Sequence, residues 1–143
     1  MTQQLVVVRH AQAVDKLKHK GHDRYRDLTS TGVKQARKTA QELHDKHIKP
    51  TIIITSAAPR AYHTAVIIGR ELEVPPNSIV VDSNLYRCGV QKWLETLAYY
   101  QSFRCVMIVG HNPELLELCH ILMDKPPSKL PKAWYIIHTF TPQ

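Results

Sequence analysis

Four side chains able to take part in phosphate chemistry each follow a short run of apolar residues. They are Arg9, His10, Arg60 and His111. The planar guanidinium group of arginine matches the oxygens of a phosphate, and a neutral imidazole nitrogen can attack phosphorus to form a phosphohistidine. These residue types predict a phosphate pocket with a histidine nucleophile, which could be either His10 or His111.

Other ways of transferring a phosphoryl group have less support in the sequence. A cysteine nucleophile of the C-x5-R type needs an arginine six positions after the cysteine, and none of the cysteines has one. The residues at those positions are Leu94 after Cys88, His111 after Cys105 and Lys125 after Cys119. A phosphate-binding loop of the form G-x-x-x-x-G-K-[ST] does not occur. The only candidates for a metal site are two isolated histidine pairs, so we expect neither a metal nor another cofactor. These pairs are His19 with His22 and His44 with His47.

The four side chains can meet only if the apolar runs before them lie side by side. The runs at 5–8, 51–55 and 105–109 are short and almost entirely apolar, which is typical of strands buried on both faces of a parallel sheet. Segments with helical periodicity separate them. This alternation predicts a three-layer α/β/α sandwich with a mainly parallel central sheet. Such sheets bind ligands at the carboxyl ends of their strands, where all four side chains stand.

Capping residues and apolar stripes place the helices between these strands. Thr29–Thr31 offer caps to one helix, and Pro59 suits the first turn of another. We expect Asn112 to cap a further helix, with Pro113 at its first helical position. The remaining expectations are an apolar stripe at Val33, Ala36, Ala40, Leu43 and His47, a helix marked by Val90, Trp93, Leu94 and Leu97, and strands at 78–82 and 134–140.

Length and composition restrict the class of protein. A chain of 143 residues with 43% hydrophobic residues is long enough for one domain, which we expect to cover 1–143. The longest apolar runs have the length of strands, so we expect no membrane span. Three widely spaced cysteines and the lack of a signal-peptide pattern at the N-terminus favour a reducing cytoplasm. We expect a monomer.

The charge of the chain is strongly positive. Its formal net charge is +7, and many of the cations fall in one segment, at Lys16, Lys18, Lys20, Arg24 and Arg26. A basic balance favours anionic partners such as phosphate, an acidic protein face or a nucleic acid. Only Tyr25 supplies an aromatic ring among these cations, so we do not expect nucleic-acid binding. Charge alone leaves open whether the segment is a solvated loop.

Four stretches of the sequence resemble the motifs of a known family. These are "VVVRHAQA", "LTSTG", "SAAPRAYHTA" and "VGHNPEL". In order and spacing they are similar to motifs of the histidine phosphatase superfamily, and most closely to its short SixA-type phosphohistidine phosphatase branch. The resemblance covers Leu5 to about Leu118. It implies a phosphoglycerate mutase-like fold and a phosphatase that works without a metal.

The resemblance also implies roles for individual residues. His10 would be the nucleophile that carries the phosphoryl group, and His111 would donate a hydrogen bond to the group in transfer. Arg9, Arg26 and Arg60 would bind the phosphate oxygens.

The proton donor is the point at which the sequence departs from the larger branches of the family. Those branches place a glutamate near the third strand, where this chain reads "SNLYRCG". Asp23 is our candidate for the general acid because of its place in the basic segment, and Asp15 is another. A donor is less necessary for some substrates, because a protonated imidazole is already a good leaving group.

The expected substrate is a phosphohistidine on a protein, such as a phosphotransfer signalling domain. Every connection except 14–29 is short, so the pocket would lack a large cover and could admit a side chain presented by another protein. Two alternatives remain open. One is a phosphatase of the same chemistry acting on a small phosphomonoester, and the other is a noncatalytic phosphate-binding module.

Overall fold

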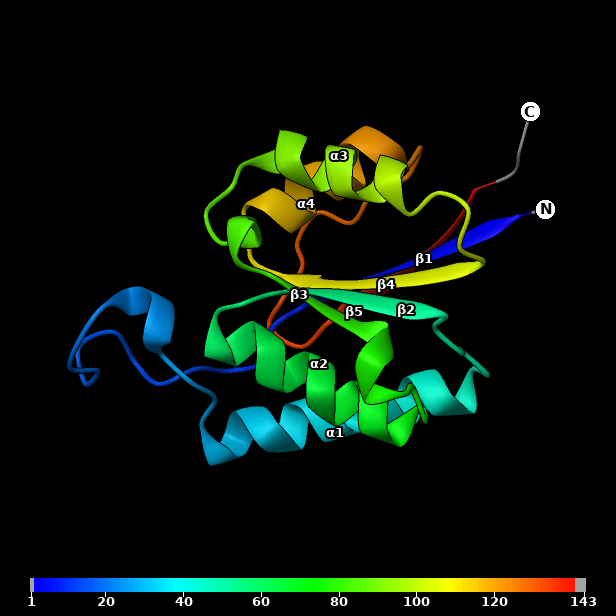
Figure 1. The fold of residues 1–143 in the computed structure, drawn as a ribbon. Coiled ribbons are helices and arrows are strands. Elements are labelled where there is room, and N and C mark those ends of the chain that lie inside the picture. The colour runs from blue at the N-terminus through cyan, green and yellow to red at the C-terminus, as the bar shows by residue number, and fades with distance from the viewer. Residues whose placement is uncertain (1, 141–143) are drawn as a thin grey trace.

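A five-stranded sheet with helices on both faces forms the centre of the molecule (Figure 1). The computed structural model describes residues 2–140. The strands are β1 (Gln3–Arg9), β2 (Ile52–Ser56), β3 (Ile79–Asp82), β4 (Cys105–Gly110) and β5 (Tyr135–Phe140), in the spatial order β3-β2-β4-β1-β5. All neighbouring strands pair in parallel except β1 and β5, which are antiparallel. The predicted sandwich with a mainly parallel sheet is therefore confirmed.

Four α-helices cover the two faces of this sheet. In Figure 1, α1 (Ser30–Asp45) and α2 (Pro59–Glu71) lie below the sheet, whereas α3 (Val90–Tyr99) and α4 (Glu114–Leu122) lie above it. Short 3-10 helices occur at Asp23–Tyr25 (η1), Pro76–Ser78 (η2) and Ser83–Leu85 (η3).

Strands β1, β2 and β4 consist mainly of apolar residues because both of their faces are buried. In β1, Val6 and Val8 belong to the core between the sheet and helices α1 and α2. Leu5 and Val7 belong to the core between the sheet and helices α3 and α4. The same alternation recurs in β4 and β2, since side chains of a strand point to opposite faces in turn. Continuous apolar runs are the pattern that a sheet covered on both faces requires.

Two of the predicted helix starts agree with the structure. Thr29 caps α1 with a side chain that accepts a hydrogen bond from Gly32 N at 3.0 Å. Pro59 stands in the first turn of α2, where its missing N–H costs nothing.

Three expectations about the helices are wrong. Asn112 does not cap α4, because its side-chain amide donates instead to the Leu130 carbonyl at 2.9 Å. Pro113 occupies the cap position and not the first helical position, which belongs to Glu114. His47 does not extend the apolar stripe of α1, because the helix ends at Asp45 and His47 is exposed with a φ of 59°. In the part of the chain that the structure describes, no helix combines the length and apolarity that crossing a membrane would take.

Candidate active site

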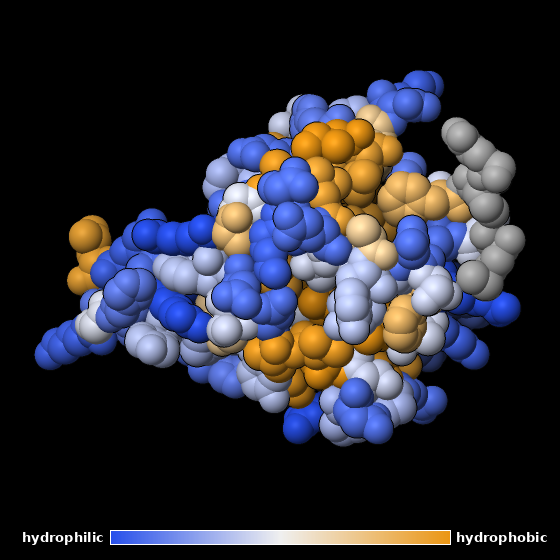
Figure 2. All heavy atoms as spheres, turned by 45° about the horizontal axis from the view of Figure 1, so that its top comes forward, coloured by the Kyte–Doolittle hydropathy of each residue, from blue (hydrophilic) through white to orange (hydrophobic). Residues whose placement is uncertain are grey.

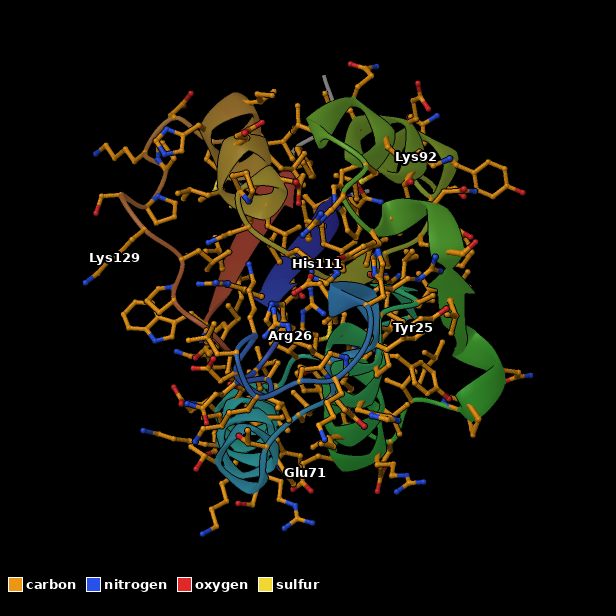
Figure 3. The ribbon with its side chains drawn as sticks, turned by 90° about the vertical axis from the view of Figure 1, so that its left-hand side faces the viewer. Tyr25, Arg26, Glu71, Lys92, His111 and Lys129 are labelled. Carbon is orange, nitrogen blue, oxygen red and sulfur yellow. The ribbon has the colours of Figure 1, made fainter. Side chains whose placement is uncertain are left out.

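A cavity of about 370 Å³ opens at the carboxyl ends of the strands. It is lined by His10, Lys16, Asp23, Arg60, Tyr86, Arg87, His111, Asn112, Pro113 and Glu114. Figure 3 looks toward this end of the molecule, with His111 near its centre and Arg26 close below it. Four of the six predicted site residues line the cavity. Arg9 and Arg26 are not among its lining residues.

The two histidines lie against each other, as the strand-end prediction required. Their ring centroids are 5.2 Å apart, with the ring planes tilted by 54°. The pairing of β1 with β4 brings them together, and the N–H of His10 donates to the Gly110 carbonyl at 3.0 Å. Two imidazoles that are about one hundred residues apart in the chain therefore face one cavity.

His10 is held in the state that a nucleophile needs. Its Nδ1 lies 2.7 Å from the Ala11 carbonyl oxygen. Because a carbonyl only accepts hydrogen bonds, Nδ1 carries the proton, and the lone pair of a neutral ring is on Nε2. Burial lowers the pKa of His10 to about 4, with further lowering by the charges of Arg60 and Arg9. The ring is therefore neutral near pH 7.

His111 is fixed by a serine at the end of β2. Its Nε2 lies 2.9 Å from Ser56 Oγ, which already accepts the Ala58 N–H at 3.2 Å. The Ser56 hydroxyl still has its proton to donate, and when it donates to His111 Nε2 the proton of the neutral ring is on Nδ1. Burial, together with the charges of His10 and Arg60, lowers the pKa of His111 to about 3. A neutral His111 of this tautomer can donate one hydrogen bond to a ligand from Nδ1.

Asp23 connects the cationic groups around the cavity. Its carboxylate accepts hydrogen bonds from Arg26 Nε at 2.7 Å, Tyr86 OH at 2.7 Å and Arg60 Nη2 at 3.3 Å, and Arg87 Nη2 is 3.5 Å away. Burial by itself raises the pKa of this carboxyl, but the hydrogen bonds from Tyr86 and Arg26 and the charge of Arg60 outweigh it and hold the pKa well below its usual range. Asp23 is therefore ionised and has no proton to give, which does not fit its expected role as general acid.

The three predicted arginines differ in how their guanidinium groups are held. Arg60 is only 4% exposed, and its Nη1 donates to the Asp23 carbonyl at 2.9 Å. Arg26 donates to the Val14 carbonyl at 2.7 Å as well as to Asp23. Arg9 Nη1 donates to the Leu130 carbonyl at 3.2 Å. Among the described residues, nothing accepts a hydrogen bond from the buried Nε of Arg9 or of Arg60.

The backbone that follows His10 is anchored by two helices. The Ala11 N–H donates to Thr64 Oγ1 of α2 at 3.1 Å, and the Gln12 N–H donates to Gln35 Oε1 of α1 at 2.9 Å. The first turn of α1 also approaches this segment so closely that a Cβ on Gly32 would lie 2.1 Å from the Gln12 carbonyl oxygen. Only glycine allows that approach, which explains the glycine of "LTSTG".

The sequence analysis missed Tyr86 and Arg87, which follow β3 through η3. Tyr86 lies edge-on to His111 with ring centroids 5.5 Å apart, and the guanidinium groups of Arg60 and Arg87 lie 5.6 and 5.4 Å from the Tyr86 ring centroid. The strand-end rule that identified the other residues applies equally to β3. The segment contains no carboxylate after Asp82, but its aromatic and cationic side chains are the signal from which Tyr86 and Arg87 could have been predicted.

A second carboxyl group, Glu114, was also missed. It lines the cavity from the first turn of α4. Burial raises its pKa, and the nearby charge of Glu117 raises it further. Unlike Asp23, Glu114 has no hydrogen bond or ion pair with another side chain of residues 2–140. Within those same residues, no group of three or more His, Cys, Asp or Glu side chains is arranged so that it could hold a metal ion.

Comparison with solved structures shows the same fold in several phosphatases. A protein from Agrobacterium tumefaciens, provisionally described as the phosphohistidine phosphatase SixA, matches 98% of this chain with 98% of its own, at 23% identity and a TM-score of 0.81. The protein histidine phosphatase SixA in complex with tungstate matches 92% of this chain with 84% of its own, at 24% identity and a TM-score of 0.77.

The same fold also occurs in a phosphatase that is named for a different substrate. The mycobacterial glucosyl-3-phosphoglycerate phosphatase matches 97% of this chain with 91% of its own, at 18% identity and a TM-score of 0.71. At such identities the likeness establishes the fold alone. A comparison with curated proteins gave no match.

Membership of a family follows from the sequence itself. The family model of the histidine phosphatase superfamily (branch 1) matches residues 5–86, which is more than half of the chain. The matched range contains His10 and Arg60, whose side chains line the cavity. This chain belongs to the histidine phosphatase superfamily, branch 1.

Proposed function

We propose that this phosphatase removes the phosphoryl group from a phosphohistidine carried by another protein. The observation that carries the proposal is the neutral, oriented imidazole of His10 beside His111, in a cavity that also holds the buried Arg60. The likeness in fold to two structures described as SixA phosphohistidine phosphatases supports this class of substrate.

In the proposed first step, His10 Nε2 attacks phosphorus while His111 and Arg60 bind the phosphoryl oxygens. A bond forms between phosphorus and His10, and the bond from phosphorus to the substrate imidazole breaks. Its electron pair stays on the substrate nitrogen and neutralises the leaving imidazolium. The carbonyl of Ala11 stabilises the positive charge that His10 acquires, because it accepts the Nδ1–H.

In the second step, water attacks the phosphorus of phospho-His10. The electron pair of the phosphorus–nitrogen bond returns to His10, and the water loses a proton to solvent. Asp23 takes no part as an acid in this scheme. Its role is to hold Arg60 in the wall of the cavity and Arg26 beside it through its charged contacts.

We assign to Glu114 the role of accepting a hydrogen bond from the leaving imidazole. A phosphorylated imidazole leaves readily only when its other ring nitrogen is protonated, and a carboxylate in the cavity can accept a hydrogen bond from that N–H. The carboxylate of Asp23 is less suited to this contact because four donors already surround it.

A small phosphomonoester is the second candidate substrate. The fold is shared with a mycobacterial phosphatase that is named for such a compound. Phosphohistidine is favoured here because the TM-scores of the two SixA structures are higher than that of the sugar phosphatase, and because a protonated imidazole leaves without needing an acid from the protein.

The test compares wild-type protein with His10→Ala on three substrates. These are a histidine-containing phosphotransfer protein phosphorylated on histidine, glucosyl-3-phosphoglycerate and p-nitrophenyl phosphate. We expect wild-type kcat/KM to be highest for the phosphoprotein and His10→Ala to lower it by about 10³-fold or more. His44→Ala, which changes an exposed histidine of α1, serves as the control with unchanged activity.

Quenching with alkaline denaturant during turnover separates an enzyme from a binding module. Wild-type protein should carry a phosphoryl label that survives alkali and is lost in acid, and His10→Ala should lack it. Wild-type hydrolysis rates in His10→Ala would contradict the nucleophile, and a higher kcat/KM for the sugar phosphate would contradict the substrate.

A further inference from the structure

The connection between β1 and α1 projects from the body of the molecule beside the cavity. It is the blue segment that extends to the left in Figure 1. We call residues 15–26 the basic loop. It carries five cationic side chains, two carboxylates and two histidines.

Both carboxylates of the basic loop are engaged inside it or at its base. Asp15 Oδ1 accepts the Leu17 N–H at 2.8 Å, and Asp23 is surrounded by Arg26, Arg60 and Tyr86. In contrast, Lys18 and Lys20 are exposed and take part in no ion pair with residues 2–140. The outer part of the loop therefore presents uncompensated positive charge.

Apolar side chains stand among these cations. Leu17 is 97% exposed and Tyr25 is 63% exposed. In Figure 2 an apolar group lies at the outer end of a projection that is otherwise strongly hydrophilic. A single exposed leucine is ordinary on a protein surface. A nearly fully exposed leucine with lysines on both sides provides both apolar contact area and positive charge that can attract an acidic partner.

The basic loop has a defined shape and is tied to the cavity. Its two ends are joined by the bridge between Ala13 and Leu28 and by the hydrogen bond from Arg26 Nη1 to the Val14 carbonyl. Within the loop, His19 Nε2 donates to the His22 carbonyl at 3.0 Å. Lys16 and Asp23 belong at once to the loop and to the wall of the cavity. A protein bound to the loop would thus lie next to the cavity that holds His10.

We propose that the basic loop is the docking surface for the protein that carries the phosphohistidine, and that it binds an acidic face of that protein. This inference rests on the proposed function. Lys18 and Lys20 attract the acidic face and align it, while Leu17 makes an apolar contact with it. The loop acts on a protein substrate and not on a small one, because Leu17, Lys18 and Lys20 lie outside the cavity wall.

Two double variants with the same change in charge test the docking surface. Lys18→Glu with Lys20→Glu alters the basic loop. Lys125→Glu with Lys129→Glu alters two exposed lysines in the connection between α4 and β5, and Figure 3 shows Lys129 at the margin of the molecule, well away from Arg26 and His111. A third variant, Leu17→Ser, removes the apolar contact without changing the charge.

The readout is kcat and KM on an acidic phosphotransfer protein phosphorylated on histidine, beside p-nitrophenyl phosphate. We expect the loop double variant to raise KM for the phosphoprotein about tenfold or more, the Leu17 variant to raise it severalfold, and the control pair to change it less than about twofold. All variants should hydrolyse p-nitrophenyl phosphate at the wild-type rate.

The remaining outcomes overturn either the docking surface alone or the docking surface together with the proposed function. An equal rise of KM in the loop and control pairs would show a general effect of net charge, which overturns the docking surface alone. Loss of activity on p-nitrophenyl phosphate in the loop pair would show damage to the cavity and would also overturn it. Wild-type protein that hydrolyses p-nitrophenyl phosphate but not the phosphoprotein would overturn the proposed function and this inference together.

Discussion

At the scale of single residues, the two carboxyl groups of the cavity differ in a way that their residue types do not reveal. Asp23 is surrounded by three arginines and a tyrosine, so its pKa lies well below the usual range. Glu114 is half-buried without such partners, and burial raises its pKa. The same cavity therefore holds one carboxyl group that binds protons weakly, Asp23, and another that binds them more readily, Glu114.

The role assigned to Glu114 predicts an effect that depends on pH. A carboxylate beside the phosphorylated imidazole favours the protonated, reactive form of the substrate. We expect Glu114→Gln to lower kcat for the phosphohistidine protein about tenfold at pH 8, and by less at pH 6, where the substrate is protonated without help. Initial rates between pH 6 and pH 8.5 measure this.

Glu117→Gln is the matched control for Glu114. Glu117 also lies in the first turn of α4 but is exposed and outside the cavity wall, so both substitutions remove the same helix-terminal charge. The control should keep the wild-type profile. An equal loss of activity on p-nitrophenyl phosphate in Glu114→Gln would contradict the contact with imidazole.

At the scale of helices and strands, the convergence of His10, Arg60 and His111 was predictable because each follows a strand. Parallel strands end at the same edge of a sheet, so position in the chain was enough. Ser56 and Tyr86 escaped notice although they also stand at strand ends. Their roles come from hydrogen bonds to His111 and Asp23 that no spacing in the sequence reveals.

The errors at helix ends have a common cause. Asn112 and His47 have residue types that suit the positions expected for them. In the structure, a tertiary hydrogen bond to Leu130 takes the side chain of Asn112, and His47 itself adopts a left-handed conformation beyond the end of α1, so it cannot join the stripe. A residue's preference for a helix or cap position is worth only about 1 kcal/mol, so the rest of the fold can override it.

The contact between α1 and the segment after His10 predicts a strong effect of one methyl group. A Cβ at position 32 would overlap the Gln12 carbonyl oxygen. Gly32→Ala must therefore displace either α1 or the segment that follows His10. We expect kcat to fall about tenfold or more and the free energy of unfolding to fall by about 1–3 kcal/mol. Steady-state kinetics and urea unfolding measure the two effects.

Thr31→Ala is the control for this prediction. Thr31 precedes Gly32 in the same turn but is exposed. Wild-type kinetics are expected for it, and a Gly32→Ala protein with full activity would show that the close approach has no part in placing His10.

At the scale of the whole molecule, the buried imidazoles of His10 and His111 make the free energy of unfolding depend on pH. The pKa of His10 falls from 6.5 to about 4 on folding, and that of His111 to about 3. The unfolded chain therefore binds more protons than the folded one at pH values below about 6.5. Stability must fall as the pH drops through this range, and the loss attributable to these groups is complete below about pH 3.

We expect His10→Asn to weaken this dependence. The lowered pKa of His10 corresponds to about 3 kcal/mol of stability lost between pH 7 and pH 3. Urea unfolding at a series of pH values should give a flatter curve for His10→Asn than for wild-type protein. His44→Asn, at an exposed position, should reproduce the wild-type slope; parallel curves for all three proteins would contradict a buried neutral His10.

The order of strands in the sheet has a consequence for how the site is assembled. Both neighbours of β1 come from the last third of the sequence, since β1 lies between β4 and β5. While a ribosome is making the chain, the strand that leads into His10 emerges before either of its neighbours and stays unpaired until β4 and β5 have followed. The proposed nucleophile is therefore synthesised well before the strands that complete its surroundings.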